Sequence, residues 1–293
     1  MSDASLREGP MVGRLPPVVK TSERKTEWVK VFVYGGARTG KTNLLRELYK
    51  SGYEILILAT ELGDTKGLQT VSDLPIDSVE CDSYDTLEAV AKHLVANKGK
   101  YANKQYNLVY LDSLTHGMEL VMEKGMVVLG WDMVFGINKG DNTKKHNSLQ
   151  VYGYAAEKGR AIMKILFEIN THLVVVAREG VMTIGEGQDQ KSWEVPELAG
   201  QKLPRELPGW PDASLRLIVQ NGQRRFVTQT IGNVIAGVRL PEGVRLPTYV
   251  NPSLSAIIKL VQGDASQVKV LTPQAGAVAT TPPVKQPVAS GVK

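Results

Sequence analysis

The segment Gly35–Thr42, with the sequence GGARTGKT, constrains this chain more than any other part of it. It fits the pattern G-x-x-x-x-G-K-[ST] and lies between an apolar run at 29–34 and a helical pattern at 41–50. Glycines let the backbone wrap closely around an anion, and the helix that follows turns its positive end towards the same anion. The segment therefore predicts a phosphate-binding loop between a strand and a helix.

The polar residues that close this loop indicate a nucleoside triphosphate and a metal ion. Lys41 can reach the β- and γ-phosphates, and Thr42 can offer its hydroxyl to Mg²⁺, so ATP and Mg²⁺ are the expected ligands. The alternative is an ordinary glycine turn. The residues predicted to contact the nucleotide are Gly35, Gly36, Ala37, Arg38, Thr39, Gly40, Lys41, Thr42 and Asn43.

Short apolar runs alternate with helical patterns along the body of the chain. Runs rich in β-branched residues suit strands buried on both faces, and they occur at 29–34, 55–60, 108–112 and 173–177. Helical patterns occur at 41–50, 85–97 and 151–169. The alternation predicts an α/β fold with a mainly parallel sheet flanked by helices. Asn221-Gly222 between 215–219 and 226–231 adds a C-terminal antiparallel hairpin.

The two ends of the chain differ from its body. Residues 1–26 and 263–293 lack sustained periodicity, and we expect a flexible N-terminal arm and a disordered C-terminal tail around one domain at 27–262. The net charge of +5 divides into +2 in each end and +1 in the body. The bulk charge is therefore no evidence that the body binds nucleic acid.

Two acidic residues follow predicted strands on the side where ligands bind to parallel sheets. Asp112 ends the run LVYLD and is the expected second Mg²⁺ ligand, beside Thr42. Glu61 follows the run ILILAT and is the candidate for activating water, because Ser113 rather than Glu follows Asp112. The alternatives are a helix-capping aspartate and a solvated loop glutamate.

These features together resemble the RecA/RadA class of P-loop ATPases. The resemblance covers roughly residues 28–240, and the stretch at 196–219 is similar to compact phage RecA-like ATPases of the Sak-type single-strand annealing group. It implies a homo-oligomer that acts on single-stranded DNA, with a single-strand-binding protein as a possible partner. It also implies a γ-phosphate sensor at the end of the fourth strand, where Arg178 stands with a structural ion pair as its alternative, and a basic residue from a neighbouring subunit, for which Arg224 and Arg225 are candidates.

In this class the loops after the third and fourth strands face DNA, and they correspond here to 125–150 and 179–193. Basic residues neutralise phosphates and aromatic rings stack on unpaired bases, although acidic residues in the second loop weaken its case. A mobile surface loop is the alternative for both. The candidates for DNA contact are Lys139, Lys144, Lys145, Trp131 and Lys191.

Other signals exclude competing chemistries. The chain has one cysteine, Cys81, and its four histidines lack the spacing of metal ligands. No apolar run is long enough to span a membrane and the N-terminus lacks a signal-peptide core, so we expect a cytoplasmic protein, in the bacterial host if it is phage-encoded. The predicted function is ATP hydrolysis coupled to recombination, annealing or repair, with catalytic residues Glu61, Lys41 and Arg178. The alternatives are a nucleotide-dependent switch or assembly factor without DNA binding, and a small-molecule kinase.

Overall fold

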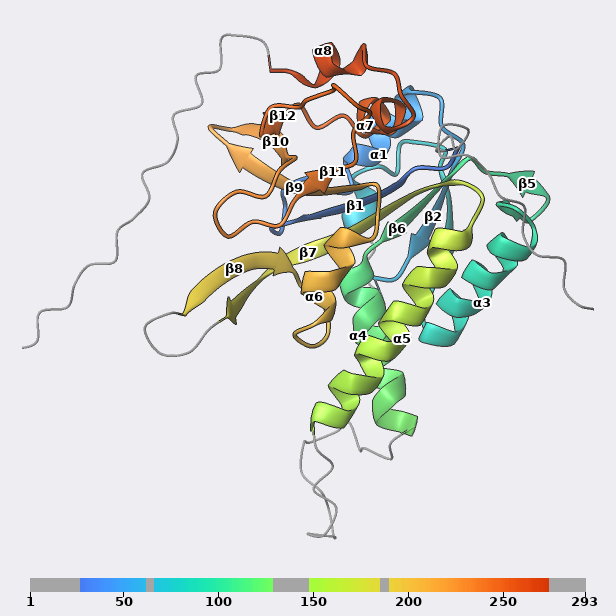
Figure 1. The fold of residues 1–293 in the computed structure, drawn as a ribbon. Coiled ribbons are helices and arrows are strands. Elements are labelled where there is room, and N and C mark those ends of the chain that lie inside the picture. Colours follow the sequence, from blue (N-terminus) through green and yellow to red (C-terminus); the bar gives the residue numbers. More distant parts are fainter. Residues whose placement is uncertain (1–26, 62–65, 129–147, 185–189, 274–293) are drawn as a thin grey trace, which may run out of the picture.

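The computed structural model of the protein describes residues 27–61, 66–128, 148–184 and 190–273. A twisted sheet with the strand order β12-β10-β9-β1-β7-β6-β2-β3 forms its centre (Figure 1). The neighbouring strands from β9 to β3 run parallel, whereas β10 and β12 are antiparallel additions at one edge. The strands of this sheet are β1 (Lys30–Gly35), β2 (Ile55–Ala59), β3 (Asp77–Glu80), β6 (Leu108–Asp112), β7 (His172–Ile184), β8 (Lys191–Pro196), β9 (Ala213–Gln220), β10 (Gln223–Val227), β11 (Gly237–Val238) and β12 (Tyr249–Val250).

Helices cover both faces of the sheet (Figure 1). The helices are α1 (Leu44–Lys50), α2 (Lys66–Gln69), α3 (Tyr84–Ala96), α4 (Leu114–Val128), α5 (Ser148–Glu168), α6 (Leu203–Glu206), the 3-10 helix η3 (Leu207–Gly209), α7 (Leu254–Val261) and α8 (Gln267–Leu271). A small separate ribbon pairs β4 (Lys100–Tyr101) with β5 (Lys104–Gln105). Helices α3, α4 and α5 pack on one face and α1, α7 and α8 on the other.

The alternation of side chains along the strands explains the two cores. In β1, Phe32 and Tyr34 point into the cluster under α3, α4 and α5, whereas Val31 and Val33 point into the cluster under α1 and α7. Strands buried on both faces need apolar residues at every position, and β2 and β6 are buried throughout. The structure confirms the predicted fold class, a mostly parallel sheet flanked by helices with antiparallel strands at the C-terminus.

The structure differs from the predicted element bounds in several places. Helix α1 begins at Leu44 and not at Lys41, because residues 41–43 form turns in which Leu44 N–H donates to Lys41 O at 3.0 Å. Strand β3 was not predicted, since its sequence DSVE is polar and it forms the edge of the sheet. Strand β10 ends at Val227, before the predicted Ile231.

The C-terminal part of the described chain also extends past the predicted boundary at 262. Helix α8 lies within the stretch predicted to be a tail, and its Leu271 is fully buried in the core under α7. The Leu271 carbonyl accepts a hydrogen bond of 2.8 Å from Asn251 N–H. Val268 also packs on this core, and the side chain of Asn251 donates to the carbonyls of Val270 and Thr272. Contacts of a few residues are too local a signal to be detected by composition, which explains the difference.

Candidate active site

The carboxyl ends of four parallel strands meet around one cavity. The loop after β1, the residue Glu61 after β2, Asp112 at the end of β6 and Arg178 in β7 all line it. The sheet register explains this, since Gly35 pairs with Arg178 and Ala59 pairs with Asp112. The cavity has a volume of about 460 Å³. This is the edge at which ligands bind to parallel α/β sheets.

The loop of residues 35–43 needs glycine at two positions. A Cβ atom on Gly35 would lie 2.4 Å from the backbone oxygen of Leu217, and Gly40 has a φ of +96° that other residues rarely adopt. The Nζ of Lys41 donates to the carbonyls of Gly35 and Gly36 at 2.8 and 2.9 Å. Burial lowers the pKa of Lys41, although nearby Asp112 opposes this effect. The ammonium is therefore held across the mouth of the loop, where it faces the cavity.

Thr42 and Asp112 form a second unit of the site. The hydroxyl of Thr42 donates to Oδ2 of Asp112 at 2.9 Å, and Asp112 is only 7% exposed. Burial raises the pKa of Asp112 to about 6, while the Thr42 hydrogen bond acts in the opposite direction. The hydroxyl of Tyr110 donates to the carbonyl of Lys41 at 2.7 Å and fixes the loop to β6. The peptide bond between Asp112 and Ser113 is cis.

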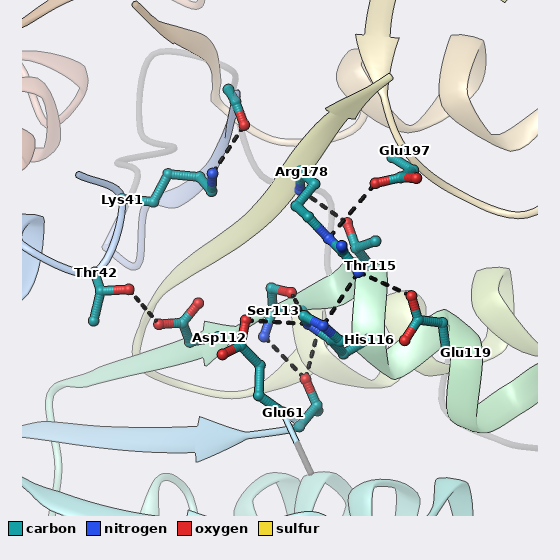
Figure 2. Close-up of polar contacts among 12 residues, drawn as sticks. Lys41, Thr42, Glu61, Asp112, Ser113, Thr115, His116, Glu119, Arg178 and Glu197 are labelled. Carbon is teal, nitrogen blue, oxygen red and sulfur yellow. Dashed lines mark hydrogen bonds and ion pairs between the residues drawn. The ribbon is translucent and has the colours of Figure 1, made fainter. Parts of the chain in front are cut away.

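Glu61 lies beside this unit with its carboxylate at the cavity. Its Oε1 is 3.2 Å from Nδ1 of His116 (Figure 2). A Cβ atom on Gly67 in α2 would lie 3.3 Å from Oε2 of Glu61 and 3.5 Å from Oγ1 of Thr42. The absence of a side chain at position 67 therefore leaves the space in which the carboxylate and the hydroxyl face the cavity.

Arg178 lines the cavity, but its guanidinium is bound to other side chains. It contacts Glu119 at 2.9 Å and Glu197 at 3.6 Å, and one of its NH₂ nitrogens is 3.2 Å from Nε2 of His116 (Figure 2). Its backbone N–H donates to Oγ1 of Thr115 at 2.8 Å. Arg178 thus makes ion pairs, as one of the two alternatives from the sequence expects, and it also borders the cavity.

Arg224 contacts the nucleotide loop of its own chain. Its Nε donates to the carbonyl of Thr39 at 2.9 Å, and the side chain lies over Gly40. The neighbouring Arg225 donates to Oδ1 of Asn251 at 2.8 Å and to the side chain of Gln223. The sequence suggested both arginines for a neighbouring subunit's site; the structure places Arg224 at its own, because β9 lies next to β1 and carries the hairpin to the loop.

Most of the residues predicted to contact DNA cannot be located. Lys139, Lys144, Lys145 and Trp131 lie outside the described residues. Lys191 is exposed at the start of β8. The stretch 179–193, predicted as a loop, contains the antiparallel pair β7 and β8, with Glu179 opposite Pro196 and Ile184 opposite Lys191.

A half-buried arginine explains why these residues form a hairpin rather than a loop. Arg216 of β9 binds Glu179 with two hydrogen bonds of 2.7 and 2.9 Å and contacts Glu194 at 2.5 Å. One residue of each hairpin strand is thus tied to the central sheet. The pairing depends on a residue well downstream, so the local sequence did not reveal it.

Two features of the site were not predicted from the sequence. One is the role of His116, which was considered only as a metal ligand, and the other is the position of Arg224 at the nucleotide loop of its own chain. The spacing of Ser113, His116 and Glu119 could have revealed the first, because residues three apart share a helix face and α4 begins directly after Asp112 and Ser113. Among the described residues no group of three or more His, Cys, Asp or Glu side chains could hold a metal ion. A cation here would have Asp112 and Thr42 as its protein ligands, with water and phosphate oxygens completing the shell, as is usual for Mg²⁺.

One family model matches most of the chain, whereas the solved structures that resemble it have low TM-scores. No helix in the described part of the chain has both the length and the apolar character that a membrane span requires. No curated protein matches the sequence significantly. A prototypical ATPase from the type III secretion system of pathogenic bacteria is similar in structure at 13% identity and a TM-score of 0.35, over 65% of this chain and 52% of that one. The chain thus spans about half the length of that ATPase.

A second solved structure, the RadB recombinase, is similar at 16% identity and a TM-score of 0.35, over 76% of this chain and 86% of that one. The model of the family described as AAA domain matches residues 27–240, which include all the cavity residues described above, and the chain therefore belongs to this AAA domain family of P-loop ATPases.

Proposed function

We propose that this protein is an Mg²⁺-dependent ATPase that acts on single-stranded DNA in recombination, annealing or repair, as phage RecA-like ATPases of the Sak type do. The observation that carries the ATPase part is the convergence of Lys41, the Thr42–Asp112 pair and Glu61 on one cavity. These groups supply a phosphate ligand, a metal site and a base for water, which are the parts that hydrolysis requires.

The side chains of Thr42 and Asp112 suit a bound Mg²⁺ ion. Thr42 and Asp112 offer a hydroxyl and one carboxylate 2.9 Å apart, and Mg²⁺ prefers oxygen ligands and commonly uses one or two carboxylates together with substrate phosphates. When bound, the cation neutralises charge on the phosphates and thereby stabilises the transition state. The Thr42–Asp112 hydrogen bond fixes the two protein ligands before the cation arrives, so their orientation needs little rearrangement.

The remaining steps belong to the side chains. The Nζ of Lys41 turns from the carbonyls of Gly35 and Gly36 to the β- and γ-phosphates, which compete for the same donors with full negative charge. The carboxylate of Glu61 orients a water molecule towards the γ-phosphorus and accepts its proton as the new P–O bond forms. The bond from the γ-phosphorus to the oxygen that bridges to the β-phosphate breaks, and ADP and phosphate leave. Both groups lie at the wall of one cavity, so positioning accounts for much of the expected rate.

The DNA part of the proposal rests on the hairpin of β7 and β8. Lys191 is exposed on the hairpin of β7 and β8, and this hairpin continues the strand that carries Arg178 at the cavity. The acidic residues Glu179 and Glu194 of the hairpin are engaged by Arg216 rather than left to repel phosphates. Lys191 is thus an exposed cation on a hairpin that is connected to the site through one strand, and it is the residue at which a nucleic-acid phosphate would bind.

Hydrolysis measured with and without single-stranded DNA and with and without Mg²⁺ tests the proposal. In Glu61→Gln we expect hydrolysis to fall by about 10²–10⁴-fold while ATP binding persists, because the amide cannot accept the proton. Glu54→Gln is the matched control, since Glu54 is an exposed carboxylate at the opposite end of the same strand, β2. It should behave as wild type.

Two outcomes would contradict the proposal separately. Unchanged hydrolysis in Glu61→Gln would remove the assigned base and favour a nucleotide-dependent switch. The second outcome is hydrolysis that responds to Mg²⁺ but not to single-stranded DNA, even at low salt where phosphate contacts are strongest. It would support the ATPase part of the proposal and contradict the part that names single-stranded DNA as the partner.

A further inference from the structure

His116 lies between the proposed base and the arginine of β7 (Figure 2). Its Nδ1 is 3.2 Å from Oε1 of Glu61 and 2.9 Å from the hydroxyl of Ser113. Its Nε2 is 3.2 Å from a guanidinium nitrogen of Arg178. One imidazole ring thus contacts Glu61 after β2, Ser113 after β6 and Arg178 within β7, and the chemistry proposed above assigns it no role.

The contact with Arg178 determines which ring nitrogen of His116 carries the proton. A guanidinium carries only hydrogen-bond donors, so Nε2 of His116 must accept from Arg178 with its lone pair. The single proton of the neutral ring is then on Nδ1, which faces the carboxylate of Glu61, a group that only accepts. If both ring nitrogens carried a proton, Nε2 could not accept from Arg178 and two positive charges would face each other. Arg178 therefore selects the tautomer whose Nδ1–H faces both the hydroxyl of Ser113, at 2.9 Å, and the carboxylate of Glu61, at 3.2 Å.

Arg178 is itself fixed from several sides. Glu119 of α4 and Glu197 after β8 hold its side chain, and Thr115 accepts from its backbone N–H. Glu119 also lies one turn of α4 beyond His116, so arginine and histidine are attached to the same helix. The guanidinium thus has a fixed orientation relative to the ring on which it acts.

We propose that His116 is a positioning residue that holds the carboxylate of Glu61 towards the γ-phosphate, with Arg178 fixing the histidine tautomer. The proposal rests on the function proposed above, since it gives Glu61 its orientation. It assigns Arg178 a role through His116 rather than direct contact with the γ-phosphate. The strand β7 then connects the hairpin of β7 and β8 to the base through one arginine and one histidine.

Three substitutions at His116 separate the two sides of the ring. His116→Ala removes both contacts, and we expect kcat to fall by about 10–100-fold at unchanged ATP affinity, as for a misplaced catalytic group. In His116→Asn the amide nitrogen stands where Nδ1 stood and still donates to Glu61, so most of kcat returns. In His116→Gln the amide reaches the Nε2 position instead, so kcat stays low. His93→Ala, at an exposed histidine of α3, is the control that keeps wild-type kcat.

A double-substitution cycle tests whether His116 acts through Glu61. Once Glu61→Gln has removed the base, His116→Ala should lower kcat by less than about 2-fold more, because residues that act as a unit are not additive. A general structural role would instead lower kcat in both backgrounds equally and would lower the melting temperature. Multiplicative losses would overturn the proposal.

The other outcomes can be distinguished as well. If Glu61→Gln keeps wild-type hydrolysis, the proposed function has failed; if it abolishes hydrolysis while His116→Ala keeps wild-type kcat, this inference alone has failed. If the alanine variant does not fold, the Asn and Gln variants decide, and equal kcat values in the two would overturn the proposal. In Arg178→Met we expect a lower kcat and unchanged affinity for ATP relative to ADP, and a selective loss of ATP affinity would overturn the role given to Arg178.

Discussion

Polar side chains lie at both ends of the parallel strands, at their amino ends (the amino edge of the sheet) and at their carboxyl ends (the carboxyl edge), and their contacts differ. At the amino edge, Nζ of Lys30 donates to the carbonyls of Ile169 and Thr171 at 2.6 and 2.8 Å, and Nδ1 of His172 accepts from the backbone N–H of Val29 at 3.1 Å. At the carboxyl edge, Lys41 and its neighbours line a cavity.

Residue type and burial do not distinguish these edges. Burial lowers the pKa of both lysines, to about 8 for Lys30, and each donates to two backbone carbonyls. The difference lies in what else they face. Lys30 connects the amino end of β1 to the segment before β7, whereas Lys41 borders open space beside Asp112 and Glu61. A perturbed pKa alone therefore indicates burial, and a functional role requires a cavity as well.

Substituting the two lysines should give opposite results and has the largest expected effect. Lys41→Ala removes the charge that pairs with the phosphates, and we expect hydrolysis to fall by at least about 100-fold. The melting temperature should change little, because water in the cavity can hydrate the two carbonyls that Lys41 leaves. Lys30→Ala leaves two carbonyls unpaired and should lower the free energy of unfolding by about 2–4 kcal/mol, while kcat per folded molecule stays unchanged. A comparable loss of kcat in both variants would break the distinction between the edges.

At the amino edge, the free energy of unfolding should also depend on pH, because His172 lies there. Burial and the nearby Lys30 lower the pKa of His172 from 6.5 to about 4, so between these values the unfolded chain binds a proton that the folded protein does not. The free energy of unfolding should therefore decrease as pH falls from 6.5 to 4, with His172 contributing about 3 kcal/mol of that decrease.

Denaturant titrations at several pH values measure this contribution as the difference between wild type and His172→Asn. The asparagine oxygen can still accept from Val29 N–H but does not titrate in this range, so its pH profile should be flatter between 6.5 and 4. Profiles that stay parallel would show that His172 is not held neutral by burial.

The sequence predicted the parts of the site that a local pattern encodes. The loop at 35–42 carries its own spacing, and Asp112 and Glu61 directly follow apolar runs, so their shared edge follows from the alternation of strands and helices. The two cores were predictable for the same reason. Successive residues of a strand point to opposite faces of the sheet, so a strand that is apolar at every position must be buried on both faces.

Contacts between distant segments could not be predicted in this way. Arg178 and His116 are 62 positions apart, and Arg224 and Thr39 are 185 positions apart. Their meeting depends on strand order: β7 lies beside β6, and β9 lies beside β1. Patterning gives the number and type of elements, but many orders of the same strands would bury the same apolar faces. The hairpin of β7 and β8 was missed for a related reason, since Arg216 of β9 joins its two strands.

Arg224 and Arg225 provide the smallest expected effect and a test of which subunit completes the site. Side chains of consecutive strand residues point to opposite faces, so Arg224 reaches Thr39 of the loop while Arg225 reaches Asn251. Arg224→Ala should weaken ATP binding by about 3–10-fold, as expected for the loss of one exposed hydrogen bond that orders the loop, and Arg225→Ala should leave ATP binding unchanged.

Mixing the Arg224→Ala and Lys41→Ala variants at an ATP concentration that does not saturate Arg224→Ala then decides between action within one chain and action on a neighbour. If Arg224 acts on its own loop, Arg224→Ala mixed with Lys41→Ala gives only the sum of the separate activities, because no chain then carries both residues. If Arg224 served the next subunit, as the resemblance to RecA-like proteins first suggested, mixed oligomers would contain sites with an intact loop from one chain and an intact arginine from the other. Hydrolysis above the sum would then appear in the mixture, and the assignment of Arg224 to its own loop would be wrong.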